Sequence, residues 1–300
     1  MQTLVTGGTG WIGRQLLGQI KLPLVVSRNR SSAKKSTGLP DQQIVEGDLS
    51  TGKIDLADHK NISQIIHLLG DSIADGRWNE KKKQTIRDSR VNGTKNLVQS
   101  LADANILPDV VVSASAIGYY GDAGDQSLSE INGAGDDFLA DVCVEWERAA
   151  QPLEDLGVRV CYLRIGIVLG QGGGALEKML PPFRLGLGGR LGSGKQWMSW
   201  IHLQDLTQII MHLLQTPHAC GPFNGTAPQP VTNSQFTKAL GKAVGRPTVI
   251  PVPGFGLKLA LGEFANFLLA SQKVVPTAVT QSGYQFRYPD LDSALQNIIN

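Results

Sequence analysis

Apolar residues in the first half of the chain form short runs that alternate with stretches of helical spacing. The first run, residues 3–6, stops at a glycine cluster, and apolar side chains follow at Ile12, Leu16, Leu17 and Ile20, the spacing of one helix face. The same alternation predicts strands at residues 24–26, 43–46, 64–69, 109–113 and 158–163, and long helices at residues 79–103 and 136–156. Alternating strands and helices are typical of a parallel sheet with helices on both faces. The sequence therefore predicts an α/β fold built on a doubly wound parallel sheet.

The pattern changes after Arg164. Residues 170–194 are rich in glycine and contain Pro181 and Pro182, which predicts an irregular excursion away from the sheet. A helix at residues 204–215 is predicted to return to the sheet, and residues 233–244, 255–270 and 292–299 are predicted to be helices of a smaller α+β unit. We therefore expect a sheet domain over residues 1–166, to which segment 200–216 returns, and a smaller substrate-side domain over residues 167–300.

The glycine cluster carries the most informative functional signal of the chain. Gly7, Gly10 and Gly13 lie between a predicted strand and a predicted helix, the arrangement that holds a pyrophosphate. One glycine makes the tight turn, one lets the backbone approach the phosphates, and one lets the helix pack closely on the strand. The helix N-terminus then offers N–H groups to the anion. This favours a Rossmann-like dinucleotide site over a structural turn, with contacts at Gly7, Thr9, Gly10, Trp11, Ile12 and Gly13.

The end of the second predicted strand indicates which dinucleotide binds. A site for NAD places Asp or Glu here, where the carboxylate accepts from the ribose 2′-hydroxyl. This chain instead has Ser27, Arg28, Asn29 and Arg30, and the next acidic residue is Asp41. A guanidinium can hold a 2′-phosphate with two hydrogen bonds, whereas a carboxylate repels it. The sequence therefore predicts NADP(H) rather than NAD(H).

Composition narrows the classes of partner. The net charge is +2 with both signs interspersed, so no basic stripe indicates nucleic acid. The three cysteines and five histidines are scattered, which predicts no metal site and suits a reducing cytoplasm. No signal peptide is recognised before the first predicted strand. The most apolar segment, residues 255–270, is interrupted by charges and shorter than a bilayer span, so no membrane partner is expected.

Several motifs resemble the short-chain dehydrogenase/reductase superfamily, in its extended, sugar-nucleotide-epimerase-like branch. They are the glycine triplet at residues 7, 10 and 13, Gly47-Asp48-Leu49, residues 92–97 and residues 200–205. Residues 182–189, 192–194, 272–276 and 283–289 further resemble the atypical "epimerase family protein" subgroup, which has a small C-terminal domain of unknown function, here residues 249–297. The resemblance implies a Rossmann-like fold that binds the nucleotide NADPH. It also implies an oxidoreductase or epimerase type of activity on a substrate that is unassigned.

The resemblance also implies cofactor contacts at individual positions. Ser27 and Arg28 are expected at the adenosine ribose and its 2′-phosphate, and Asp48 at the adenine amino group. The remaining expected contacts are Leu68, Leu69 and Gly70 along the adenine side and ribose, Arg90 from the long helix, Ser113 beside the nicotinamide ribose, and the backbone from Arg164 to Ile167 at the nicotinamide.

The catalytic pattern of that superfamily is missing. It uses a tyrosine whose pKa is lowered by a lysine four residues later, because one helical turn places phenol and ammonium on the same face. None of the five tyrosines of this chain is followed by lysine at that spacing. Alignment of the helix on Trp146-Glu147 places Leu139 and Cys143 where the pair belongs.

Two functions stay open. In the first, Ser115 orients a carbonyl or sugar-nucleotide-like substrate and Tyr119 or Tyr120 supplies a proton. In the second, the protein binds NADPH without turnover, as a redox sensor or a module that binds a regulatory partner. The oligomeric state is not predicted. His202 and Asp205 are expected to cap and orient the returning helix rather than to catalyse.

Overall fold

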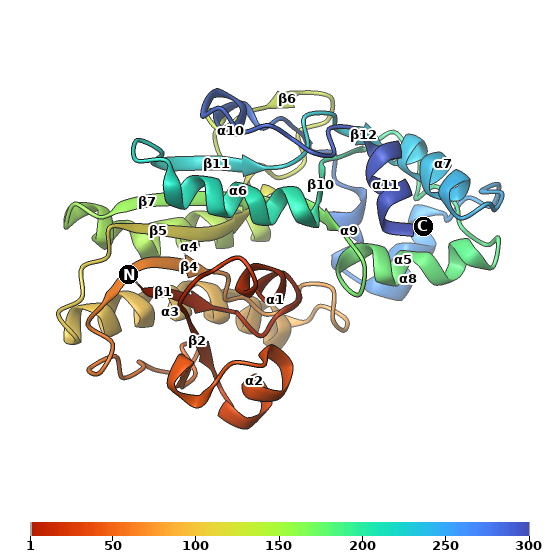
Figure 1. Ribbon diagram of the computed structural model, residues 1–300. Coiled ribbons are helices and arrows are strands. Elements are labelled where there is room, and N and C mark those ends of the chain that lie inside the picture. The colour runs from red at the N-terminus through yellow and green to blue at the C-terminus, as the bar shows by residue number, and fades with distance from the viewer. Residues whose placement is uncertain (1, 300) are drawn as a thin grey trace.

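The computed structural model describes residues 2–299, which form a larger lobe around a seven-stranded sheet and a smaller lobe at one end of it (Figure 1). All neighbouring strands of the sheet are parallel, in the order β11-β7-β5-β4-β1-β2-β3. The strands are β1 Gln2–Thr6, β2 Pro23–Ser27, β3 Ile44–Glu46, β4 Ile62–His67, β5 Val110–Ala116, β7 Arg159–Ile165 and β11 Gly221–Gly225. Chain order reverses between β1 and β4, the switch point at which doubly wound sheets bind ligands.

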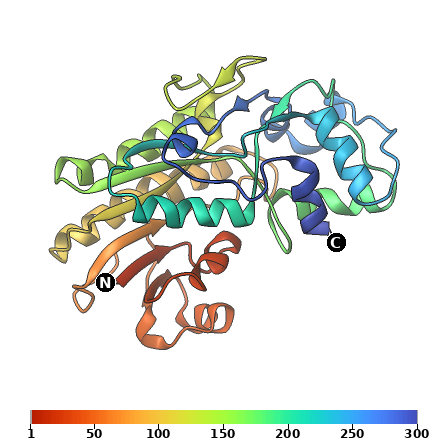
Figure 2. The same cartoon turned by 45° about the horizontal axis from the view of Figure 1, so that its top comes forward.

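Helices cover both faces of this sheet, because successive strand residues point to opposite sides and both sides are apolar. Leu4 and Ile65 pack with residues of α3 (Glu80–Asp103) and α4 (Phe138–Asp155). Their neighbours Val5 and Ile66 pack on the other face, with residues of α1 (Trp11–Leu17) and α6 (Leu203–Gln215). Figure 2 shows α6 lying along that face. The predicted doubly wound α/β fold is confirmed.

The smaller lobe is mostly helical and has its own apolar core around Trp200, Phe236 and Leu295. Its helices are α5 Gly174–Arg184, α7 Asn233–Ala243, α8 Gly254–Leu261, α9 Phe264–Leu269 and α11 Leu291–Ile299. Its short strands are β8 Ile167–Leu169, β9 Trp197–Met198, β10 Trp200–His202 and β12 Val231–Thr232. The remaining elements are α2 Arg30–Thr37, β6 Ser127–Leu128, β13 Lys273–Val274, α10 Thr277–Gln281 and two short 3-10 helices, η1 Asp41–Gln43 and η2 Ile117–Tyr120.

The structure corrects the sequence prediction at three places. Residues 170–194 are not irregular throughout, because α5 lies within them; its two prolines fall in the last turn, where few backbone bonds are lost. Residues 255–270 form two helices instead of one, since Gly262 between them has a positive φ of 62°. Strand β11 is absent from the prediction, because its sequence Gly-Pro-Phe-Asn-Gly has the composition of a turn.

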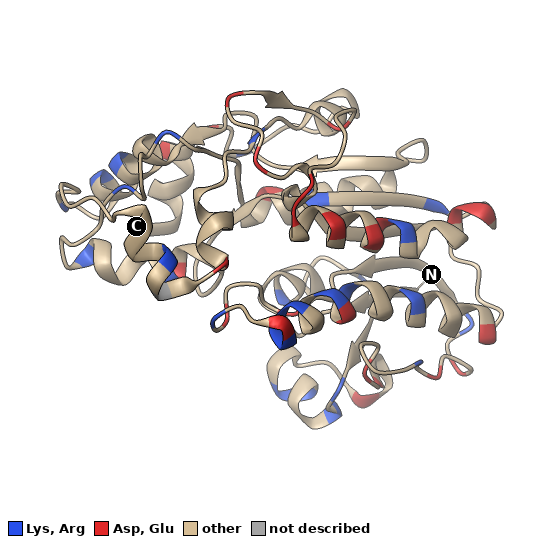
Figure 3. Cartoon of the chain, turned by 180° about the vertical axis from the view of Figure 1, so that it is seen from behind, with Lys and Arg blue, Asp and Glu red and all other residues tan. Residues whose placement is uncertain are grey.

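The charged residues of α3 and α4 differ in sign. Seen from behind, α4 carries mostly acidic positions, whereas α3 carries both signs with basic positions in the majority (Figure 3). Within residues 2–299, no helix is both long and apolar enough to cross a membrane.

Candidate functional site: a groove at the carboxyl ends of β1, β2 and β4

A groove of about 690 Å³ lies at the sheet edge where the carboxyl ends of β1, β2 and β4 meet. Its lining brings together nine of the predicted cofactor contacts: Gly7, Thr9, Gly10, Ser27, Arg28, Asp48, Leu68, Leu69 and Gly70. The groove is therefore at the switch point of the sheet, where the topology by itself predicts a ligand.

The turn from β1 into α1 has the conformation expected for a pyrophosphate site. Gly7 has a φ of 70°, and a Cβ there would lie 2.6 Å from the carbonyl oxygen of Leu68, so only glycine fits. The Gly10 N–H donates to the Gly7 carbonyl at 2.9 Å and closes the turn. A Cβ at Gly13 would overlap the Gly7 carbonyl, so this third glycine lets α1 pack closely on the turn.

The first turn of α1 keeps its N–H groups available. Gly10 is the N-cap, and within the described residues no side chain caps this helix end. The N–H groups of the first helical turn have no partner inside the helix. Such a helix end favours a phosphate, because the helix dipole adds a partial positive charge to these donors.

Arg28 follows β2 and its side chain is exposed at the groove. Among the described residues that line the groove, Arg28 is the single lysine or arginine, whereas Asp48, Asp71, Asp75 and Asp88 are acidic. Ser32, near the N-terminus of α2, also lines the groove. A second anionic group in this groove therefore finds its counter-charge at Arg28.

Asp48 also lines the groove, after β3. One of its oxygens, Oδ1, accepts from the backbone N–H and the hydroxyl of Ser50, at 3.0 and 2.6 Å. These bonds hold the carboxylate in place and leave Oδ2 for another donor, such as an amino group.

The other predicted cofactor residues are not part of the groove lining and are held by protein contacts. Ile12 packs into the core beside α6, and Ile167 lies on β8 and pairs with Trp200. Arg90 donates to the carbonyls of Ile86 and Asp71 at 3.1 and 3.0 Å, and its guanidinium lies 5.1 Å from the centre of the Trp146 ring. Burial lowers the pKa of Arg90. Ser113 is buried, and its hydroxyl has no hydrogen-bond partner among the described residues.

His67, at the end of β4, is a residue that the sequence pattern does not single out. It is 1% exposed and lies between two threonines, with Nδ1 2.7 Å from Thr6 Oγ1 and Nε2 2.9 Å from Thr94 Oγ1. Thr94 donates its own proton to the Arg90 carbonyl at 2.7 Å, so it accepts from His67 Nε2, and Nδ1 accepts from Thr6. The ring is thus held neutral, and burial lowers the pKa of His67 to about 4.

At the carboxyl end of β7, a buried ion pair joins this strand to α4. Arg164 on β7 donates through Nε and Nη2 to the two carboxylate oxygens of Glu147 on α4, both at 2.9 Å. The two side chains are 4% and 14% exposed. Bidentate geometry and burial make this a specific and strong contact. Although burial alone lowers the pKa of Arg164, its hydrogen bonds to Glu147 raise it overall.

Two of the three predicted catalytic hydroxyls are bound into this ion pair. Ser115 donates to Glu147 at 2.6 Å. Tyr120 accepts from Arg164 at 3.0 Å, donates to Asn224 at 2.8 Å, and is 3% exposed. Burial raises the pKa of Tyr120. Both hydroxyls therefore stabilise the network, and a substrate has to compete with charged or buried partners to reach them.

Tyr119 is different. Its side chain is half-buried, the Arg164 guanidinium lies 3.4 Å from the centre of its ring, and no residue in the described range bonds its hydroxyl. Leu139 and Cys143, which the sequence predicts at the positions of the missing catalytic pair, lie on α4, and burial raises the pKa of the Cys143 thiol to about 12. Cys143 therefore stays a protonated thiol that donates to the Ala116 carbonyl.

Glu147 serves in the sequence as an alignment point and has no predicted role. The signal that reveals it is an acidic residue within the apolar face formed by Ala140, Cys143, Trp146 and Ala150 of α4. A carboxylate at such a place requires a buried cation, and Arg164, which follows the buried run 160–163 of β7, is the available one.

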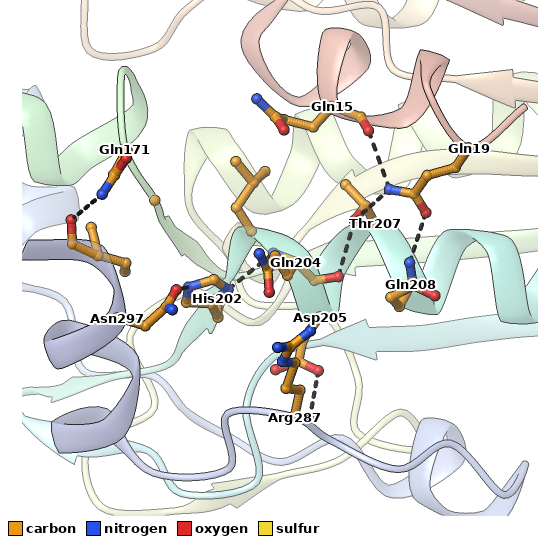
Figure 4. A pocket seen from close by; sticks show the side chains of 13 residues that line it. Gln15, Gln19, Gln171, His202, Gln204, Asp205, Thr207, Gln208, Arg287 and Asn297 are labelled. Carbon is orange, nitrogen blue, oxygen red and sulfur yellow. Dashed lines mark hydrogen bonds between the residues drawn. The ribbon is translucent and has the colours of Figure 1, made fainter. Parts of the chain in front are cut away.

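A second cavity, of about 680 Å³, lies on the other side of α1, between α1, α6 and α11 (Figure 4). Here His202 accepts from the Gln204 N–H at 3.0 Å and thereby caps α6, and it stacks on Tyr288. Asp205 accepts from the Tyr284 hydroxyl and from two backbone N–H groups, of Arg287 and Tyr288. The predicted capping role is confirmed for His202, whereas Asp205 does not cap α6 and instead joins its first turn to residues 284–288.

Comparison with known proteins defines the class. A family model described as "NAD dependent epimerase/dehydratase family" matches residues 3–224, and one described as "Domain of unknown function (DUF1731)" matches residues 252–298. The chain belongs to the NAD dependent epimerase/dehydratase family, the extended short-chain dehydrogenase/reductase type. The predicted resemblance, including its C-terminal domain, is confirmed.

Individual relatives narrow this further. The chain is 39% identical to the chloroplastic SDR39U1 homolog of Arabidopsis thaliana, an epimerase family protein, over 100% of this chain and 87% of that protein. The crystal structure of human epimerase family protein SDR39U1 with NADPH is 35% identical, with a TM-score of 0.88 over 100% of this chain and 99% of that one. The Streptomyces venezuelae dTDP-glucose 4,6-dehydratase, solved with NAD and TYD bound, shares the fold at 21% identity, with a TM-score of 0.77 over 100% and 96% of the two chains.

Proposed function

We propose that this protein is an NADP(H)-dependent oxidoreductase or epimerase-like enzyme of the extended short-chain dehydrogenase/reductase type. One observation carries the choice of cofactor: Arg28 is the single basic side chain among the described residues that line the groove, which otherwise has acidic residues. The human relative solved with NADPH supports the same choice. When bound, the nicotinamide accepts or donates a hydride at the substrate carbon.

Different groove residues bind different parts of the cofactor. The N–H groups at the start of α1 hold the diphosphate, and Gly7 and Gly10 let the backbone approach it. Arg28 and Ser27 bind the 2′-phosphate and the adenosine ribose, while Asp48 accepts from the adenine amino group. Leu68, Leu69 and Gly70 form the wall along the ribose. We place Arg90, Ser113 and the backbone from Arg164 to Ile167 toward the nicotinamide half.

Tyr119 is the proton donor of this proposal. Its hydroxyl has no bond to a described residue, whereas those of Ser115 and Tyr120 are committed to Glu147, Arg164 and Asn224. Ser115 and Tyr120 then hold the network that positions Tyr119, because Arg164 contacts both tyrosines. The substrate is a carbonyl or sugar-nucleotide-like molecule bound from the smaller lobe; the dehydratase that shares the fold was solved with TYD.

Turnover tests the enzymatic proposal. The purified protein is mixed with NADPH and a panel of aldehydes, ketones and sugar nucleotides, and nicotinamide absorbance is followed. We expect oxidation with at least one carbonyl class, and a loss of about 100-fold or more in kcat for Tyr119→Phe, as is usual for loss of a general acid. Tyr120→Phe is the matched control and is expected to retain more activity. Full activity of Tyr119→Phe would contradict the role of Tyr119.

A second function is favoured by one specific observation: no tyrosine of the chain is followed by lysine four residues later. The alternative is a protein that binds NADPH without turnover and reports the redox state to a partner. Affinity capture with and without NADPH separates the two proposals. Cofactor-dependent recovery of a partner together with no turnover across the panel supports the sensor, and equal recovery with turnover supports the enzyme.

For the location we propose the cytoplasm. Cys143 and Cys161 are buried and Cys220 is exposed, all three as free thiols, which suits a reducing compartment. The Arabidopsis relative is named chloroplastic, so a plastid is the alternative location. Fractionation of cells that express a tagged copy checks this, and recovery outside the cytoplasmic fraction contradicts it.

A further inference from the structure

Trp11 connects the cofactor turn to the smaller lobe. It is the first residue of α1, directly after Gly10, so its backbone N–H belongs to the helix end that we propose to hold the diphosphate. Its indole contacts the turn that precedes α5 and is not part of the groove lining. One residue therefore contacts the proposed phosphate site with its backbone and the substrate-side lobe with its indole.

The turn is shaped around the indole. A Cβ at Gly170, Gly173 or Gly174 would lie 2.9, 2.5 or 2.6 Å from atoms of the Trp11 ring, so these three positions accept only glycine while the indole is in place. Gly174 also has a positive φ of 71°. The Trp11 Nε1–H donates to the Gln171 carbonyl at 2.9 Å, and Gln171 Nε2 donates to the Ile298 carbonyl of α11 at 2.8 Å. Figure 4 shows this last bond beside the second cavity.

Helix α5 contacts the groove at a second point. Lys178, one turn into the helix, donates to the Ala74 carbonyl at 2.8 Å and pairs with Asp75 at 2.5 Å. Asp75 is one of the residues that line the groove. The buried side chains of Leu176 and Phe183 fix α5 to the core of the smaller lobe. Movement of α5 relative to the groove therefore moves that core as well.

We propose that Trp11 is a positioning residue that couples occupation of the cofactor groove to the placement of α5 and the smaller lobe. The proposal rests on the proposed NADP(H) site. A phosphate on the Trp11 N–H fixes the start of α1, and the indole then fixes the turn at residues 170–174. By linkage, a fixed turn also favours cofactor binding by the same factor.

Hydrogen exchange of the α5 amides, with and without NADPH, tests the coupling. In the wild-type chain we expect NADPH to slow exchange across residues 174–184 by about tenfold, within the usual range of coupling between sites. In Trp11→Ala, NADPH still binds, with a Kd raised by about the same factor, and the slowing of α5 is largely lost. Trp11→Phe, which keeps a ring but not the N–H, is expected to be intermediate.

A second variant guards against misfolding of Trp11→Ala. Gly173→Ala displaces the Trp11 indole without altering the sequence of residues 7–13, so it should also uncouple α5. Gly18→Ala is the matched control, because Gly18 has a φ of −67° and a Cβ added there would have no described atom within 4 Å. It should behave as wild type.

The outcomes separate the two proposals. Equal slowing of α5 in wild type, Trp11→Ala and Gly173→Ala overturns the coupling, as does NADPH binding to wild type without any slowing of α5. If NADPH does not bind the wild-type chain at all, the proposed cofactor site is overturned, and the coupling with it.

Discussion

Two regions lie at the carboxyl ends of the strands: the groove at β1, β2 and β4, and the buried ion-pair network at β7. They are built on different principles. The proposed adenosine end is an open groove with an exposed arginine, exposed α2 residues and, at the start of α1, N–H groups that no side chain caps among the described residues. The proposed nicotinamide end is closed by the buried Glu147–Arg164 pair, with Ser115 and Tyr120 bound to it. The first end has the glycine and arginine pattern expected for cofactor binding, whereas the second lacks the tyrosine and lysine pair of the superfamily. Cofactor binding and turnover in this chain therefore depend on different residues and can be tested separately.

The largest expected effect is a loss of unfolding free energy when the buried ion pair of the closed end is broken. Glu147→Ala leaves the Arg164 guanidinium buried without its counter-charge, and removal of one partner of such a pair costs about 3–5 kcal/mol of unfolding free energy. Urea unfolding of wild type and variant measures the difference.

An exposed ion pair supplies the control for that experiment. Lys34 and Asp41 pair at 3.4 Å with side chains 57% and 51% exposed, so Asp41→Asn is expected to cost less than about 1 kcal/mol. If Glu147→Ala costs no more than Asp41→Asn, the buried pair does not hold this end of the sheet together.

The next largest effect is on the stability of the fold in acid. It comes from His67, which lies on β4 between the two ends. The fold holds this ring neutral and lowers its pKa from 6.5 to about 4, whereas the unfolded chain binds the proton at the ordinary value. The unfolded state therefore binds more protons between these values, so stability is complete above about pH 6.5 and falls as the pH drops to about 4. A shift of this size corresponds to about 3 kcal/mol.

Unfolding free energies at pH 7 and pH 4 check this, with His67→Gln as the matched variant. Glutamine keeps hydrogen bonding to Thr6 and Thr94 but does not titrate. Wild type should lose about 3 kcal/mol more than His67→Gln over this range. Parallel losses in the two proteins would show that His67 is not the titrating group.

The adenosine end can be predicted from the sequence better than the nicotinamide end, for a physical reason. The glycine turn and Arg28 act through local backbone geometry and position after a strand, both of which can be recognised within a few residues. The Glu147–Arg164 pair joins α4 to β7 across 17 residues and depends on how these elements pack. Ser115 and Tyr120 are recognisable as catalytic candidates, but the partners that occupy their hydroxyls depend on that packing.

The same reasoning applies to the fold. Strong periodicity locates β1, α3, α4 and α6 to within a few residues. Helix α5 escapes prediction because Pro181 and Pro182 indicate a break, although in the last turn they remove only the donors for the carbonyls of Glu177 and Lys178. β11 forms because β7 offers an open edge, and nothing in its own residues indicates a strand.

The smallest of these effects bears most directly on the central claim, that the Arg28 guanidinium recognises the 2′-phosphate of NADP(H). The measurement is the Kd for NADPH and for NADH of wild type, Arg28→Ala and the control Lys35→Ala, whose side chain is exposed on α2 away from the groove lining. Loss of hydrogen bonds to a charged group predicts a weakening of NADPH binding by about 10- to 100-fold in Arg28→Ala, with NADH binding and the Lys35→Ala control nearly unchanged. Equal affinity of the wild-type protein for the two cofactors, or an unchanged NADPH affinity in Arg28→Ala, would contradict the account.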